Sequence, residues 1–244
     1  MNGKTRPRRV IVLVAAVLGA LLTARLGVWQ LARAAQKEAL QALLDSRAGA
    51  PPLDAARLAD DPASAAAQHY RHVLLRGRWV EGRTVFLDNR VMNGRPGFYV
   101  VTPLQLEGDG AVLVQRGWVP RDAADRTRLP ALPLPAGVVE LQGLIAPPPS
   151  RLVQLGAETP GAIRQNLDLD SFSRETGLPL HPLSVLQQDA PGTAPDGLAR
   201  QWPRPAVDVH KHYGYAFQWF ALAGLITVLY VWFQLVRPRL RGGA

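Results

Sequence analysis

Two long apolar runs, one near each end of the chain, constrain this 244-residue sequence more than any other feature. Residues 213–233 contain Gln218 as their only strongly polar side chain. Residues 10–22 are wholly apolar, and the run continues with Arg25 as its main interruption. About 20 apolar residues are needed to cross the hydrocarbon core of a bilayer. The pattern predicts two transmembrane helices, over residues 10–32 and 213–233.

The first run also has features of a secretory signal peptide. A basic segment precedes it, and residues 32–34 have the small-x-small form of a cleavage site. Trp29 and Gln30 lie between the apolar run and that site, which makes an unusually long and bulky cleavage region. In an uncleaved anchor, Arg25 extends its side chain to the interface and Trp29 lies at the interface. We favour the anchor, and cleavage remains the alternative.

The flanking charges predict the orientation of both spans. Four cations precede the first run, and three follow the second, namely Arg237, Arg239 and Arg241. The positive-inside rule then places residues 1–9 and 234–244 in the cytoplasm. Residues 33–212 lie on the far side, which is the periplasm of a Gram-negative bacterium. We therefore expect a multi-pass protein of the bacterial inner (plasma) membrane. Its net charge of +9 serves orientation among lipids, and we expect no nucleic-acid partner.

The segment between the spans reads mainly as short strands. A helical continuation ends at the prolines of residues 50–52, and β-branched and aromatic runs begin at Tyr70. The fold class predicted is a membrane protein in which two transmembrane α-helices flank one mainly antiparallel β (α+β) extracytoplasmic domain, residues 33–212. Its strands are expected over residues 70–79, 84–88, 98–106, 111–119, 138–145 and 183–188.

The domain offers no constellation for catalysis. Asp168 and Asp170 are its closest acidic pair, and they suit the start of a short helix that Gly177 ends. The sequence has no Gly-rich phosphate loop, no H-E-x-x-H and no G-x-S-x-G. It also has no cysteine, which excludes disulfides, cysteine-ligated metals and a thiol nucleophile. We therefore expect a protein that is not an enzyme.

Two histidines directly precede the second apolar run. His210 and His212 are two residues apart, so on a helix they point about 200° from each other and only one can serve a given metal. The face that begins at His212 continues through Tyr215, Ala216, Trp219 and Ala223. A flat apolar macrocycle with an axial histidine suits such a face. The alternative is that this face packs against the first helix.

Four segments resemble the signature segments of the Surfeit locus protein 1 family, in the order in which that family has them. Residues 26–33 read LGVWQLAR, and residues 96–104 read PGFYVVTPL. Residues 112–120 read VLVQRGWVP, and residues 212–220 read HYGYAFQWF. Each match is modest alone, and the four together are specific to this family.

The resemblance implies an assembly factor for haem-copper (cytochrome c) oxidase. It implies that the protein binds haem a, carried as cargo, and presents it to the catalytic subunit, subunit I; haem a synthase is a further partner. The closing motif makes His212 the metal ligand. Family members often have Asn just before it, where this chain has His210 and Lys211, and Gln115 replaces another usual Asn. The choice between the two histidines therefore stays open.

Further contacts to the cargo follow from the predicted topology. Trp29 and Gln30 fall at the same outer depth as His212, so we count them with Tyr215 and Trp219 as cofactor-binding residues. Cationic side chains near this depth would pair with the haem carboxylates. Arg suits a carboxylate best, because its guanidinium can donate two parallel hydrogen bonds. Arg116 is one such cation, or else it braces a tight turn before Gly117. The alternative function is a cofactor-free membrane chaperone or scaffold for the oxidase subunit.

Overall fold

The computed structural model describes residues 5–108, 110–150, 152, 161–190, 195–203 and 209–241. The chain divides into two compact units. The helix unit comprises Met1–Leu43 and Pro205–Ala244, and the sheet unit comprises Leu44–Arg204.

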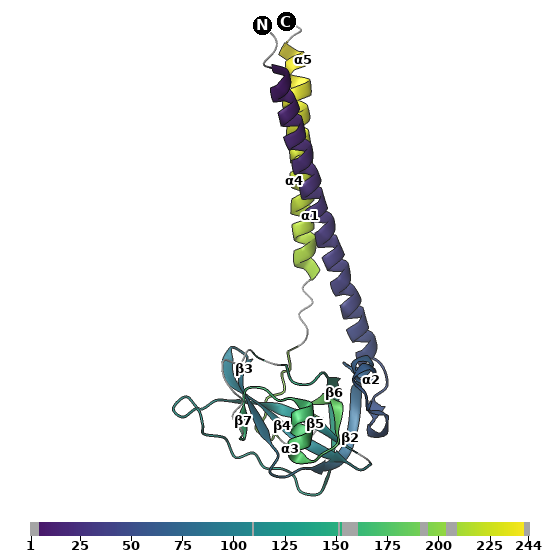
Figure 1. The fold of residues 1–244 in the computed structure, drawn as a ribbon, viewed down its shortest axis with the longest axis vertical. Coiled ribbons are helices and arrows are strands. Elements are labelled where there is room, and N and C mark those ends of the chain that lie inside the picture. Colours follow the sequence, from purple (N-terminus) through teal and green to yellow (C-terminus); the bar gives the residue numbers. More distant parts are fainter. Residues whose placement is uncertain are drawn as a thin grey trace. The chain divides into compact units, whose positions relative to one another are not determined.

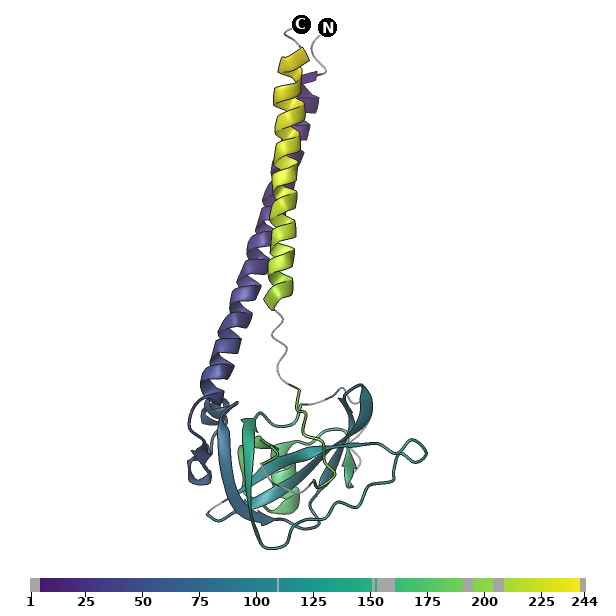
Figure 2. The same ribbon diagram turned by 180° about the vertical axis from the view of Figure 1, so that it is seen from behind.

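Two long helices make up the helix unit. Helix α1 spans Thr5–Ala48, and its last turn belongs to the sheet unit. Helix α4 (Val209–Val231) continues through a π-helical turn, η2 (Trp232–Val236), into α5 (Arg237–Arg241). Figures 1 and 2 show α1 and α4 side by side, with the start of α1 next to α5, so the pair is antiparallel.

Both helices have the length and composition of membrane spans. The stretches Arg9–Ala48 and Val209–Leu240 reach mean hydropathies of 2.3 and 1.9. Most of their large apolar side chains point outward and are exposed, as in Leu18 and Phe217. The helices fit the two apolar segments expected from the sequence, and α1 continues to Ala48, which confirms the predicted helical continuation before the prolines of residues 50–52.

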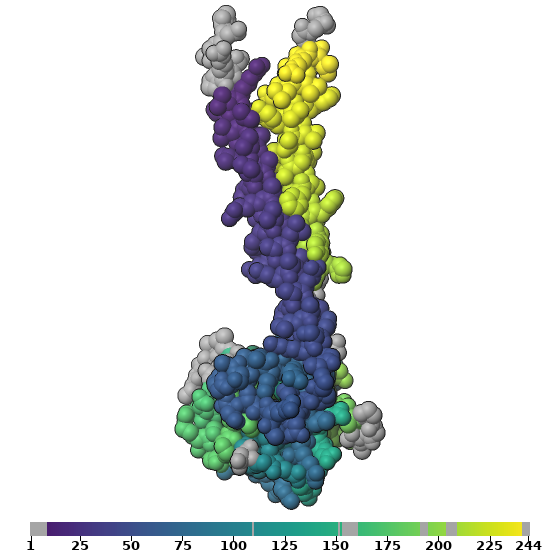
Figure 3. Space-filling view, turned by 90° about the vertical axis from the view of Figure 1, so that its right-hand side faces the viewer, coloured from purple at the N-terminus to yellow at the C-terminus, as the bar shows by residue number. Residues whose placement is uncertain are grey.

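Small side chains line the contact between α1 and α4. Thr23 and Ala34 on α1 and Ala216 on α4 are buried, and Figure 3 shows the two helices touching over much of their length. A Cβ atom at Gly27 would lie 2.8 Å from Cζ of Phe220, so only glycine lets that ring lie against α1. Small residues allow helix backbones to approach closely. One face of α4 therefore packs against α1, as the alternative interpretation of that face proposed.

In its described residues the sheet unit contains eight strands and three short helical elements. They are β1 (Leu53–Asp54), η1 (Ala55–Arg57), α2 (Pro62–Gln68), β2 (His72–Trp79), β3 (Val85–Met92), β4 (Arg95–Leu106), β5 (Ala111–Pro120), β6 (Val138–Ala146), β7 (Ile163–Arg164), α3 (Leu169–Thr176) and β8 (Leu180–Gln187).

Five of these strands close into a ring. The order is β2-β6-β8-β5-β4, and β4 pairs with β2 through its last residues. All neighbours in the ring are antiparallel except β5 and β8, which are parallel. An odd number of strands cannot alternate in direction all the way round a closed ring, so one parallel pair is required. The sheet is therefore mainly antiparallel, as predicted, with parallel pairing of β5 with β8, of β1 with β2 and of β3 with β7.

Strand β5 is the centre of the core. Val112 and Val114 pack into one cluster of buried residues, and Leu113 packs into another that contains Phe172 of α3. Figure 1 shows α3 lying over this part of the sheet. Asp168 caps α3 by accepting a hydrogen bond from the Ser171 N–H at 3.0 Å. The predicted short helix and its cap are thus confirmed.

Two features of the sheet unit were not expected. Helix α2, which the sequence analysis did not predict, is capped by Asp61 and has Pro62 in its first turn. Strand β3, expected to end at Asp88, continues to Met92 and turns into β4 through Asn93 and Gly94, both at positive φ. An Asn-Gly pair is a strong signal for such a hairpin, and it was present in the sequence.

Candidate functional site

A polar pair joins the two helices of the helix unit. His212 Nδ1 lies 2.7 Å from Gln30 Oε1, although the two residues are 182 positions apart in the chain. An amide oxygen only accepts hydrogen bonds, so Nδ1 donates and carries the ring proton. The other ring nitrogen, Nε2, then has a free lone pair. This is the tautomer in which an imidazole binds a metal through Nε2, oriented by a partner on Nδ1.

The positions of Gln30 and His212 explain why they meet. Gln30 follows Gly27 by three residues and precedes Ala34 by four, so it continues the small-residue contact face of α1. His212 precedes Ala216 by four residues and so begins the matching face of α4. A face of small and apolar side chains therefore ends in one hydrogen-bonded polar pair.

A second hydrogen bond joins the same ends of the two helices. Tyr213 Oη donates to Glu38 Oε1 at 2.8 Å, and both side chains are exposed. The guanidinium of Arg33 lies 5.6 Å from the centre of the Trp29 ring, one turn from Gln30. Local sequence patterns do not single out Glu38, because its partner lies on the other helix.

The remaining predicted residues of the helix unit lie in two settings. Trp219 is half-buried on the α4 face that begins at His212. Tyr215 and Trp29 are exposed, at 51% and 50%, and lie outside the helix contact. His210 is exposed and takes no part in the hydrogen bond to Gln30. The structure thus brings Gln30 and His212 together and leaves two aromatic rings on the open surface of the pair.

Arg116 belongs to the sheet unit. Val100 of β4 pairs with Gly117, whereas Val101 pairs with Gln115, so Arg116 is the extra residue of a β-bulge in β5. A bulge turns a side chain away from the alternation of its strand. Arg116 therefore does not brace a tight turn: β5 runs on to Pro120, and Gly117 instead admits Leu198, whose Cβ would lie 2.6 Å from a Cβ at Gly117.

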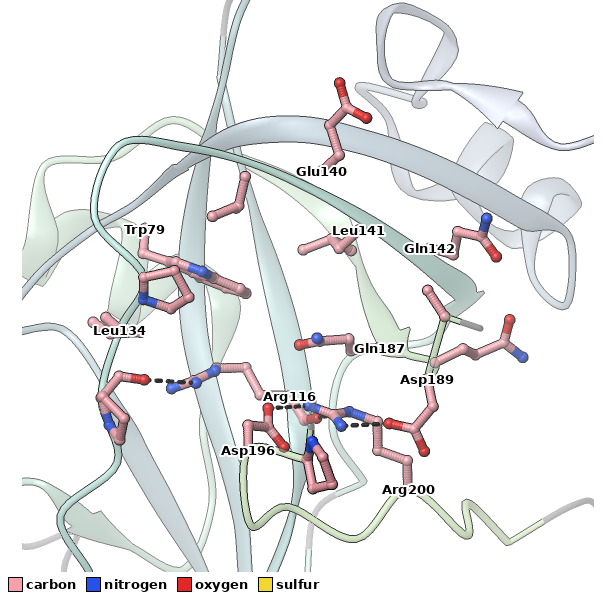
Figure 4. A pocket seen from close by; sticks show the side chains of 16 residues that line it. Trp79, Arg116, Leu134, Glu140, Leu141, Gln142, Gln187, Asp189, Asp196 and Arg200 are labelled. Atoms are coloured by element: carbon pink, nitrogen blue, oxygen red, sulfur yellow. Dashed lines mark hydrogen bonds and ion pairs between the residues drawn. The ribbon is translucent and has the colours of Figure 1, made fainter. Parts of the chain in front are cut away.

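The Arg116 side chain lines a pocket of about 450 Å³ within the sheet unit (Figure 4). Its guanidinium lies 5.2 Å from the centre of the Trp79 ring, and its Nη2 donates to the Pro133 carbonyl at 3.2 Å. Burial lowers the pKa of this guanidinium. Arg200 lies beside it and donates to Asp189, to Asp196 and to the Arg116 carbonyl.

No group of three or more His, Cys, Asp or Glu side chains that could hold a metal ion occurs in the described ranges. A single imidazole is the usual axial protein ligand of haem iron in many proteins, and such a site needs no further side-chain ligand.

The chain thus belongs to the class of proteins in which two apolar helices of spanning length flank a single, ring-closed sheet unit. The sequence pattern of the SURF1 family matches residues 17–224, and the chain belongs to this family. It is 26% identical over 209 residues to a SURF1-like protein of Rickettsia bellii, covering 84% of this chain and 83% of that protein.

Relatives from eukaryotes are similarly distant. Surfeit locus protein 1 of Rattus norvegicus is 28% identical over 226 residues, with 86% of this chain and 70% of that protein covered. The cytochrome oxidase assembly protein SHY1 of Saccharomyces cerevisiae is 28% identical over 158 residues, with 62% of this chain and 40% of that protein covered. The four sequence segments therefore identified the family correctly.

Proposed function

We propose that this protein is a membrane-anchored, non-enzymatic assembly factor for cytochrome oxidase. Family membership and the name of the yeast relative support the assembly role. Two helices of spanning length support the membrane anchor, and the basic residues next to both runs support cytoplasmic termini at a bacterial inner membrane. The partners in this proposal are the oxidase catalytic subunit, subunit I, haem a synthase and membrane lipid.

The proposed cargo is haem a, held by His212. The observation that carries this proposal is the 2.7 Å hydrogen bond between His212 Nδ1 and Gln30 Oε1, which leaves Nε2 as a ligand atom. An iron porphyrin supplies its own four equatorial ligands, so one imidazole completes its attachment, and a single axial bond is weak enough to allow transfer.

The surroundings of His212 fit a large apolar ring with carboxylate arms. Trp29, Tyr215 and the half-buried Trp219 supply aromatic surface near it along the two helices. Arg33 is exposed one turn beyond Gln30 and suits a carboxylate. Phe220 packs onto Gly27, so in our proposal the macrocycle lies at the open end of the helix pair and not deep between the helices.

The test is the absorption spectrum of protein purified from cells that make haem a. Wild type is expected to carry haem a with a Soret band, and His212→Ala is expected to lose it. His210→Ala is the matched control, because it removes an exposed imidazole two residues away and should keep the band. A band lost only in His210→Ala would assign the ligand to the other histidine.

The second candidate is a cofactor-free chaperone or scaffold for the oxidase subunit. The close packing of Phe220 on Gly27 fits it, because α1 and α4 contact each other directly at this point. In that case the Gln30 to His212 bond only fixes the alignment of the helices. Wild-type protein that stays colourless in haem a-producing cells, yet co-purifies with subunit I, would establish this alternative.

A further inference from the structure

The Arg116 pocket holds a buried guanidinium whose hydrogen-bonding capacity is largely unused. Arg116 is 3% exposed, and its Nε and Nη1 have no hydrogen-bond partner among the described residues. Within the described part of the chain, Nη2 donates to the Pro133 carbonyl. A buried donor without a partner destabilises the folded protein, and more so when it is charged. A ligand that supplies an acceptor would remove this destabilisation.

The charged side chains that line the pocket favour the binding of one negatively charged group. Two buried guanidinium groups line it, those of Arg116 and Arg200, and Arg200 already has Asp196 and Asp189 as partners. The side chain of Asp189 is 70% exposed, so water screens its charge, whereas that of Asp196 is 31% exposed. Glu140 also lines the pocket, but its side chain is 78% exposed and lies 3.7 Å from Arg76. The less exposed charges, those of Arg116, Arg200 and Asp196, leave one positive charge in excess, which a single carboxylate would balance.

The rest of the lining is suited to an apolar group. The walls are made largely of apolar side chains and prolines, with the Trp79 ring over the guanidinium in Figure 4. The apolar lining includes Trp79, Pro133, Leu134, Val139 and Leu141. The pocket also contains a buried acceptor without a partner among the described residues, Gln187 Oε1.

We propose that this pocket binds the free C-terminal end of an apolar polypeptide, with the terminal carboxylate on Arg116. The carboxylate alone would also come from a simple organic acid or a porphyrin propionate. A terminal amino-acid residue adds a backbone N–H next to the carboxylate, and Gln187 Oε1 offers the matching acceptor. Capture of a chain terminus by buried donors is a known mode of peptide recognition. The proposal does not depend on haem binding at His212.

Three small probes separate the groups that the pocket recognises. N-acetylleucine carries the carboxylate, the N–H and an apolar side chain; isocaproate lacks the N–H; N-acetylleucinamide lacks the negative charge. The full-length protein in detergent is labelled with fluorotryptophan, and the Trp79 resonance, assigned with Trp79→Phe, is followed by fluorine NMR. We expect N-acetylleucine to shift it saturably, isocaproate to bind more weakly, and N-acetylleucinamide to bind at least about tenfold more weakly.

Two substitutions test the named side chains. Arg116→Lys keeps the charge but loses the fork of donors, and should weaken N-acetylleucine binding about tenfold. Gln187→Ala should remove the advantage of N-acetylleucine over isocaproate. Arg90→Lys is the matched control, because Arg90 is a buried guanidinium outside this pocket that bonds to Ser150 and Gln165, and it should leave binding unchanged.

The result can overturn the proposal in full or in part. Equal binding of N-acetylleucine and N-acetylleucinamide would refute the carboxylate site, as would unchanged affinity in a folded Arg116→Lys. If that variant loses the separate Trp118 and Trp202 resonances and is therefore unfolded, the three probes on wild type decide alone. Isocaproate that binds as well as N-acetylleucine would overturn the polypeptide terminus and assign the pocket to a simple acid or propionate.

Discussion

The helix unit and the sheet unit place their apolar side chains in opposite ways. In the sheet unit Phe98, Leu113 and their neighbours are fully buried within the unit. In the helix unit Phe217 is 74% exposed, and small residues make the internal contact. The sheet unit therefore makes its own core, whereas the helix unit leaves its large apolar side chains outside its internal contact.

The four family motifs also differ between the two units: those in the sheet unit are explained by packing, whereas those in the helix unit contain a polar pair. Residues 96–104 and 112–120 form the paired, buried strands β4 and β5, and Trp118 donates from its ring N–H to the Arg90 carbonyl. Packing accounts for most of these residues. Gln30 and His212 are different, because a contact face of small side chains does not need a polar pair. A motif residue that packing does not require is the better candidate for function.

The largest expected effect comes from making one substitution in each unit. Phe98→Ala removes a fully buried ring and should lower the free energy of unfolding of the sheet unit by about 3–5 kcal/mol. Phe217→Ala makes the same change on an outward face and should alter stability by about 0.5 kcal/mol or less. Urea unfolding in detergent, followed by near-ultraviolet circular dichroism, measures both. Equal losses would contradict the contrast between the units.

The next effect concerns the orientation of the proposed ligand. Gln30→Leu keeps the side-chain size but removes the acceptor for His212 Nδ1, so His212 loses its fixed tautomer. We expect haem a affinity to fall about tenfold, as is usual when such an orienting partner is lost. Gln218→Leu, an exposed amide on α4, is the control and should keep wild-type affinity. Haem titration followed by absorbance measures the difference, and equal affinity in both variants would remove Gln30 from the site.

A smaller effect is expected at the start of α3. Asp168→Ala removes the carboxylate that accepts from the Ser171 N–H, and should cost about 1 kcal/mol of sheet-unit stability. Asp170→Ala lies two residues later, in the first turn and exposed, and should cost clearly less. Thermal unfolding of the two variants compares them directly, and an equal loss would show that Asp168 acts only through its charge.

The smallest effect is a pH dependence at Asp196. Burial raises the pKa of this carboxyl, but hydrogen bonds from Arg200 and the Leu198 N–H, with the charges of Arg200 and Arg116, outweigh burial and hold the pKa below its ordinary value of 3.8. The unfolded chain takes up the proton first, so the stabilisation is complete well above that value and is lost as pH falls below it. Unfolding free energies from about pH 5 to about pH 3 should fall less steeply in Asp196→Asn than in wild type.

Local sequence patterns predicted the strands and the α3 cap because alternation and capping depend on neighbouring residues. They did not predict the bulge at Arg116, since a bulge is fixed by the register between β4 and β5. The Arg116 pocket was missed for the same reason: Trp79, Pro133 and Arg200 reach it from separate parts of the chain. Local patterns also did not pair Gln30 with His212. The prediction that the two residues lie near each other came from the predicted topology, which places both at the same depth of the membrane.

The most direct test of the central claim restores the missing ligand chemically. His212→Gly protein, purified from cells that make haem a, is treated with imidazole and haem a, and its Soret band is compared with that of untreated variant and of wild type. We predict that the variant alone is colourless and that imidazole restores a wild-type-like band, with Gln30→Leu in the same chain reducing the rescue. A His212→Gly variant that carries haem a without imidazole would contradict the assignment of Nε2 as the ligand.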